Sequence, residues 1–220
     1  MAQSNVVTTQ AQTHSAVYGA DNIAQQPVIP IPYDFTFFTL PGDESSPVHL
    51  LSPLNGDTVD ETLFWIPSIG TLIAGDTVFS HDVHVWLADL QTPALTDAWL
   101  DTLDYIEYLK PKYIVPGHSV STTHFGYSID LSYTRRYLRF WKEEIEPRDS
   151  NYFTPREIFD KFNSSFPGPL SGNNTGTAIA ILNATAEQYG RGGTRQIEYL
   201  DLAAFNSTAA LEEWRFIPSG

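Results

Sequence analysis

Two short stretches decide the fold: Thr71-Leu72-Ile73-Ala74-Gly75-Asp76-Thr77-Val78-Phe79 and Lys112-Tyr113-Ile114-Val115-Pro116-Gly117-His118. Each begins as an apolar run typical of a strand and then reaches a glycine beside a polar side chain, Asp76 or His118. Between them a helix is predicted to start after Thr92 and Pro93. Its apolar residues repeat at helical spacing: Leu95, Trp99, Leu103 and Ile106. We therefore expect two strand ends, carrying Asp76 and His118, to converge at one rim of a sheet.

The two stretches resemble the strand–Gly-Asp and strand–Pro-Gly-His segments of the metallo-β-lactamase superfamily, and the resemblance covers roughly residues 30 to 190. In that family the Asp bridges two metal ions and the His binds one of them, and Asp76 and His118 occupy those positions. The resemblance implies an α+β fold, the C-terminal portion of a metallo-β-lactamase-like αββα sandwich.

The departures from the family pattern concern its metal ligands. The family's upstream His-x-His-x-Asp-His motif is missing, because the only earlier histidines, His14 and His49, are isolated, so we expect an N-terminally truncated member. Asn55 stands where a further family histidine would fall. Zinc takes three or four ligands, so Asp76 and His118 alone predict a protein without a metal cofactor. If zinc is bound, His84 is expected to join Asp76 and His118 as a ligand.

A histidine and an aspartate that face one pocket can act as a general acid–base pair. We therefore predict a metal-independent isomerase, dehydratase (a lyase) or cyclase that acts on a small natural-product intermediate of secondary metabolism. His118, Asp76 and His84 are its predicted catalytic residues; His84 matches a pocket histidine of many relatives. The predicted substrate-binding residues are His81, Trp65, Trp86, Phe125, Tyr127 and Tyr133. The alternatives are a zinc-dependent hydrolase of a thioester or lactone, and a non-catalytic binding protein.

The composition limits the classes of partner that the protein is expected to bind. Twelve Lys and Arg against 26 Asp and Glu give a formal net charge of −14, which argues against nucleic acid and anionic membrane surfaces. The absence of cysteine excludes disulfides and thiolate metal sites. Residues 1–12 are polar, without the apolar run of a signal peptide, and no stretch reaches the length of a membrane span. We expect a cytoplasmic protein with a small-molecule substrate.

Three regions are predicted: a flexible N-terminal arm over residues 1–25, the domain over 26–190, and a C-terminal extension over 191–220. Strands are expected over 35–40, 48–51, 62–66, 71–74 and 113–115, and helices over 92–110, 129–146, from 154 onward, and over 178–188. A truncated sandwich would leave one apolar sheet face uncovered, so we expect a homodimer.

Overall fold

The computed structural model describes Gly19, Asp21 and residues 33–121, 125, 127–149, 151–171 and 175–193. It divides into two units, Met1–Phe35 and Thr36–Gly220, and every strand and helix discussed below belongs to the second. The predicted N-terminal arm, apart from Gly19 and Asp21, and the predicted extension beyond residue 193 lie outside the described residues. Among the described helices, none has both the length and the apolar character needed to cross a membrane.

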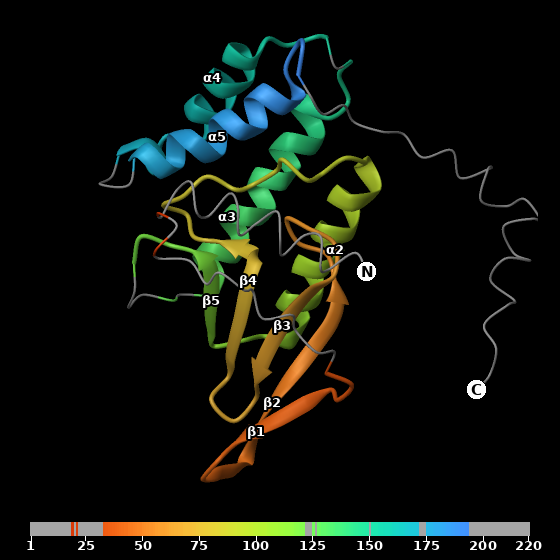
Figure 1. Ribbon diagram of the computed structural model, residues 1–220, viewed down its shortest axis with the longest axis vertical. Helices are drawn as coiled ribbons and strands as arrows, with labels where there is room; N and C mark the ends of the chain where they lie inside the picture. The colour runs from red at the N-terminus through yellow and green to blue at the C-terminus, as the bar shows by residue number, and fades with distance from the viewer. Residues whose placement is uncertain are drawn as a thin grey trace, which may run out of the picture. The chain divides into compact units, whose positions relative to one another are not determined.

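The second unit is built on a five-stranded sheet whose strands follow one another in chain order (Figure 1). The first four strands pair antiparallel, whereas the last two run parallel. The strands are β1 (Phe37–Leu40), β2 (Asp43–Leu54), β3 (Glu61–Ile66), β4 (Thr71–Phe79) and β5 (Tyr113–His118). This is the α+β class predicted from the sequence.

The parallel pair continues further than the sequence predicted. We expected strands over 71–74 and 113–115, but pairing persists, with irregular register, through Gly75↔Pro116 to Phe79↔His118. The glycines therefore bend the strands without ending them, because the neighbouring parallel strand still offers backbone partners. Asp76 and His118 consequently lie within strand ends and not in the turns beyond them.

Helix α2 (Pro93–Leu109) connects the two parallel strands. Thr92 caps it by accepting a hydrogen bond from the backbone N–H of Leu95 at 3.4 Å, and Lys110 ends it in the left-handed conformation. Trp99, Leu103 and Ile106 are buried, as the helical spacing predicted.

The remaining helices form a group joined by aromatic side chains. They are α3 (Tyr127–Phe140), which continues as a π-helical turn (Trp141–Ile145), α4 (Pro155–Ser165), a short 3-10 turn (Gly168–Ser171) and α5 (Thr175–Tyr189). Rings from α3, from α4 and from the residue after α4 stack together: Tyr133, Tyr137, Phe140, Phe162 and Phe166. Trp141 contacts Tyr189 of α5, so α5 is fixed to the end of α3.

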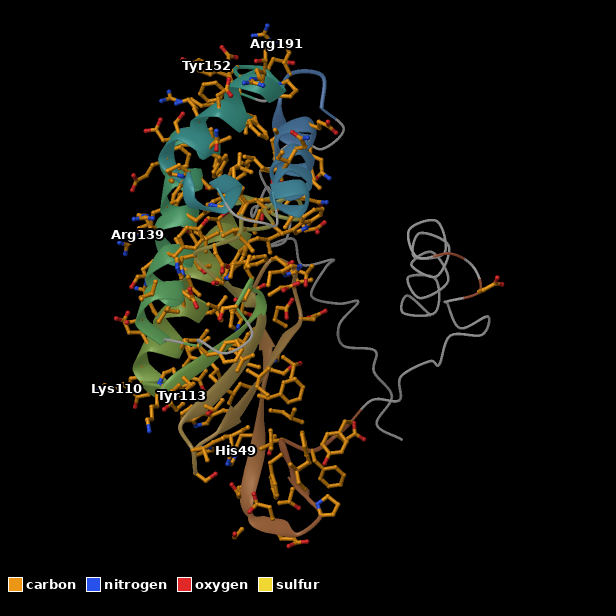
Figure 2. All side chains as sticks on the ribbon, turned by 90° about the vertical axis from the view of Figure 1, so that its left-hand side faces the viewer. His49, Lys110, Tyr113, Arg139, Tyr152 and Arg191 are labelled. Atoms are coloured by element: carbon orange, nitrogen blue, oxygen red, sulfur yellow. The ribbon has the colours of Figure 1, made fainter. Side chains whose placement is uncertain are left out.

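The two faces of the sheet differ. Figure 2 shows α2 and α3 on one side of it, and the side chains buried there include Leu63, Leu72 and Ile114. Because paired residues share a face, the register places an apolar row on the opposite face. This row, called the open-face row below, consists of Leu50, Phe64, Ile73 and Val115.

Candidate functional site

Asp76 and His118 form a hydrogen-bonded pair where the two parallel strands end. Nδ1 of His118 lies 2.8 Å from Oδ1 of Asp76, and the two side chains are 44% and 33% exposed. A carboxylate can only accept, so Nδ1 carries the proton and Nε2 is left to exchange protons with a bound molecule. The structure thus brings together the two residues on which the sequence analysis rests.

Two glycines make this approach possible. Gly75 has φ +53°, a conformation that favours glycine, and it bends β4 just before Asp76. At Gly117 a Cβ atom would overlap Oδ1 of Asp76 and lie 2.7 Å from the backbone carbon of Gly75. The Gly-Asp and Pro-Gly-His segments therefore fit each other sterically as well as chemically.

His118 is held on its other sides by the end of β4. The ring of Phe79 stacks on the imidazole with centroids 5.2 Å apart, and Ser80 donates its backbone N–H to the His118 carbonyl at 3.0 Å. The hydrogen bond to Asp76 raises the pKa of His118; burial opposes this, and the charge of Asp76 adds to the increase. The ring is therefore suited to donate a proton near neutral pH.

Asp57, which was not predicted as a site residue, belongs to the same neighbourhood. It follows β2, and in Figure 1 the β2–β3 turn lies at the same end of the sheet as the ends of β4 and β5. Burial, the charges of Asp76 and Glu61, a hydrogen bond with Glu61 and the charge of Asp89 raise the pKa of Asp57 to about 8. A carboxylic acid that keeps its proton near neutrality thus lies close to the pair. The only signal in the sequence was an acidic residue in a turn, which usually lies exposed in solvent.

His81, a predicted substrate-binding residue, forms a second pair with a carboxylate. Its Nδ1 lies 2.8 Å from Oδ1 of Asp130 on α3, and its own backbone N–H donates to the same oxygen at 3.0 Å. The Asp130 side chain is 5% exposed, whereas that of His81 is 57% exposed. Asp130 was not singled out from the sequence, because 49 positions separate the two residues.

His84, predicted as catalytic and as a third metal ligand, lies in the aromatic core. It is fully buried, its Nδ1 is 3.0 Å from the hydroxyl of Tyr137, and Nε2 has no hydrogen-bond partner among the described residues. Burial lowers its pKa to about 4, so the ring is neutral at physiological pH. These surroundings suit packing better than proton exchange with a substrate, and among the described residues His84 forms no three-residue metal-binding group with Asp76 and His118.

The predicted pocket aromatics occupy different surroundings. Trp65 is half-buried on the helix-facing side of β3, and Trp86 is half-buried with its indole N–H donating to Asp89 at 2.8 Å. Tyr133 is buried, donates its hydroxyl to the carbonyl of Val83 at 2.8 Å, and has its pKa raised by burial. Phe125 is partly buried, and the Tyr127 side chain lies outside the described part of the chain. Their role in substrate binding stays a prediction.

The family resemblance implies a metal centre, and the side chains that the structure describes do not form one. Within the described residues, no group of three or more His, Asp or Glu side chains is placed to hold a metal ion. Asp76 and His118 give only two donors, and their facing atoms are engaged with each other.

Over part of its length the chain is similar to solved structures of metallo-β-lactamases. The matching solved structures include the metallo-β-lactamase from Pontibacter korlensis (21% identity, TM-score 0.37, 57% of this chain and 55% of that chain) and the metallo-β-lactamase IND-7 (19%, 0.37, 58% and 54%). The metallo-β-lactamase DIM-1 also matches (22%, 0.36, 48% and 45%). The chain spans about half the length of these structures. No protein-family model matches the sequence, and no curated protein matches it. With TM-scores below 0.5, no residue role is transferred from these structures.

Proposed function

We propose that Asp76 and His118 are the acid–base centre of an enzyme that moves protons on a small, uncharged organic molecule, in an isomerisation, dehydration or cyclisation. The observation that carries the proposal is the 2.8 Å hydrogen bond between Nδ1 of His118 and Oδ1 of Asp76, at strand ends that solvent can reach. Loops and strand ends on a rigid sheet are where proteins place such groups.

The proposed chemistry follows from the protonation of the ring. The raised pKa of His118 favours the ring that is protonated on both nitrogens, and Nε2 of that ring can donate its proton to a carbonyl oxygen or to a departing hydroxyl group. Asp76 stabilises the charged ring and fixes its orientation. Such a pair suits a reaction in which a carbonyl becomes an enol, or in which water leaves.

The preference for an uncharged substrate rests on the carboxylates nearby. Glu61, Asp76 and Asp89 all act on Asp57, so negative charge is concentrated where a substrate would approach. A phosphate or carboxylate on the substrate would be repelled there, as would the anionic groups of a thioester cofactor.

The test uses cyclohexanone, an uncharged ketone whose α-hydrogens exchange slowly at neutral pH. The protein is incubated with it in D2O, and deuterium uptake is followed by NMR for the wild type, His118→Gln and Asp76→Asn. We expect uptake above the buffer rate with the wild type, and a loss of about tenfold or more in both variants. Equal rates in wild type and variants would contradict the proposal.

The same samples separate the alternatives. ¹H–¹⁵N NMR of the imidazole ring must show the proton of neutral His118 on Nδ1, and this preference must weaken in Asp76→Asn. A zinc-dependent hydrolase would instead hold stoichiometric zinc in untagged protein and lose activity with a chelator. A binding protein would bind ligands equally well after either substitution.

A further inference from the structure

We infer that His81, held by Asp130, is a second proton-transfer residue that serves the same substrate as His118. The inference rests on the proposed function and adds to it the base that a proton-donating His118 requires. It stands on the geometry of two histidine–carboxylate pairs on adjoining segments of chain.

The two pairs have the same construction. In each, a carboxylate oxygen lies 2.8 Å from Nδ1 of the histidine, so the Nε2 atom is the one left to react. Both histidines are substantially exposed, at 57% for His81 and 44% for His118. A histidine at the surface is hydrated by solvent and does not need a buried carboxylate beside it. The carboxylate instead fixes the orientation of the imidazole ring.

Asp130 is positioned by more than His81. Its Oδ1 also accepts from the hydroxyl of Ser80 at 3.3 Å and from the backbone N–H of His81 at 3.0 Å. One turn further along α3, Thr134 accepts from the N–H of Phe79 at 3.0 Å. Helix α3 thus fixes the segment that leaves β4, and with it the direction of His81.

The segments that carry the two histidines are joined by their backbones. Phe79 is the ladder partner of His118, and the next residue, Ser80, donates to the His118 carbonyl. Beyond them, the N–H of Val120 donates to Oδ1 of Asp82 at 3.2 Å. The segments that carry His81 and His118 therefore leave the carboxyl ends of the two parallel strands together, joined by these hydrogen bonds.

The two residues complete one enolisation. Nε2 of neutral His81 takes a proton from the carbon next to the substrate carbonyl, and the C–H electron pair becomes the new C=C bond. The C=O π electrons move to oxygen, which receives the Nε2 proton of charged His118. His81 ends charged and His118 neutral, so the step balances and needs no oxidant or metal. Return of the proton at another carbon gives an isomerisation.

The experiment compares His81→Gln and Asp130→Asn with His49→Gln, a matched control at a histidine on β2 outside the site (Figure 2). Cyclohexanone is titrated into each ¹⁵N-labelled protein, and the imidazole signals are followed alongside deuterium uptake. We expect the signals of both His81 and His118 to shift while that of His49 does not. Uptake should fall about tenfold or more in His81→Gln and remain unchanged in His49→Gln.

Asp130→Asn tests whether Asp130 positions the imidazole ring of His81. In this variant the ring proton of His81 should lose its preference for Nδ1 and deuterium uptake should fall. The circular dichroism spectrum should stay unchanged. If uptake falls in His118→Gln but is unaffected in His81→Gln, the inference is wrong and the proposed function stands. If neither substitution lowers uptake, the proposed function itself has failed.

Discussion

At the scale of single residues, Asp57 predicts how stability depends on pH. Its pKa is raised to about 8 in the folded protein from about 4 in the unfolded chain, so the folded state binds more protons between these values. Stability contributed by Asp57 is therefore present at low pH and is lost as the pH rises through 8. His84 has the opposite effect, and only below about pH 6.5. Its pKa is lowered to about 4 in the folded protein, so between these values the unfolded chain binds more protons and stability falls as the pH falls.

Asp57→Asn should remove the loss of stability at alkaline pH, because the amide keeps a hydrogen-bond donor for Glu61 and carries no charge. At pH 8.5 we expect the melting temperature to exceed that of the wild type by about 3–6 °C, and the difference to shrink toward pH 5. Differential scanning calorimetry across this range measures it. A variant less stable than the wild type at pH 8.5 would show that Asp57 is ionised and satisfied in the folded state.

Gly117 predicts a steric requirement at the same place. In Gly117→Ala the new methyl group overlaps the carboxylate of Asp76, so either the pair separates or the two strands move apart. We expect a loss of about 2 kcal/mol or more in stability, or loss of the Nδ1 proton preference of His118, measured by urea unfolding and by NMR. Gly176→Ala is the control, because nothing lies within 4 Å of the added atom and the site is helical.

How far the sequence predicts the site depends on the distance between partners along the chain. Asp76 and His118 were found because a family pattern names both. Asp130 and Asp57 were missed: their chemistry appears only when α3 and the β2–β3 turn are placed against the ends of the parallel strands. When an aspartate lies in a helix or a turn, the sequence alone does not show whether it binds a distant histidine or faces solvent.

At the scale of elements, the start of α4 allows the contribution of helix capping to stability to be measured. The side chain of Thr154 accepts from the N–H of Glu157, and Glu157 accepts from the N–H of Thr154 in return at 2.8 Å. Thr154→Ala should cost about 1 kcal/mol, or about 2–4 °C in melting temperature. Ser164→Ala, which removes a hydroxyl near the exposed end of the same helix, should not destabilise the protein. Equal effects of the two would contradict a specific capping role.

The elements themselves were largely predictable, because helix starts and apolar periodicity are local signals. The Thr92-Pro93 start of α2 is confirmed, and α4 begins at Pro155 where a helix from residue 154 onward was predicted. The ends of the strands were not predictable from local signals. Whether β4 continues past Gly75 depends on its pairing with β5, which lies more than thirty positions away along the chain. Pairing between distant segments decided the length of both strands.

At the scale of the whole molecule, the sheet is apolar on both faces although α2 and α3 lie on only one of them (Figure 2). Ile73 of the open-face row is 39% exposed, and its cross-strand neighbours Phe64 and Val115 are partly buried. A contiguous apolar surface of this kind is costly in water. Since the side chains of the row are all apolar, it can pack against an identical row related by a two-fold axis.

We propose that the chain forms a homodimer through the open-face row. Light scattering after gel filtration should give twice the 24.6 kDa of one chain, and Ile73→Glu should give a single chain with unchanged circular dichroism. Tyr108→Glu, at a residue 79% exposed on α2, is the matched control and should remain dimeric. Because each copy carries a net charge of −14, salt should tighten the association between 20 and 200 mM by screening the repulsion. A wild-type protein that elutes as one chain at both salt concentrations would show that the row is covered in another way.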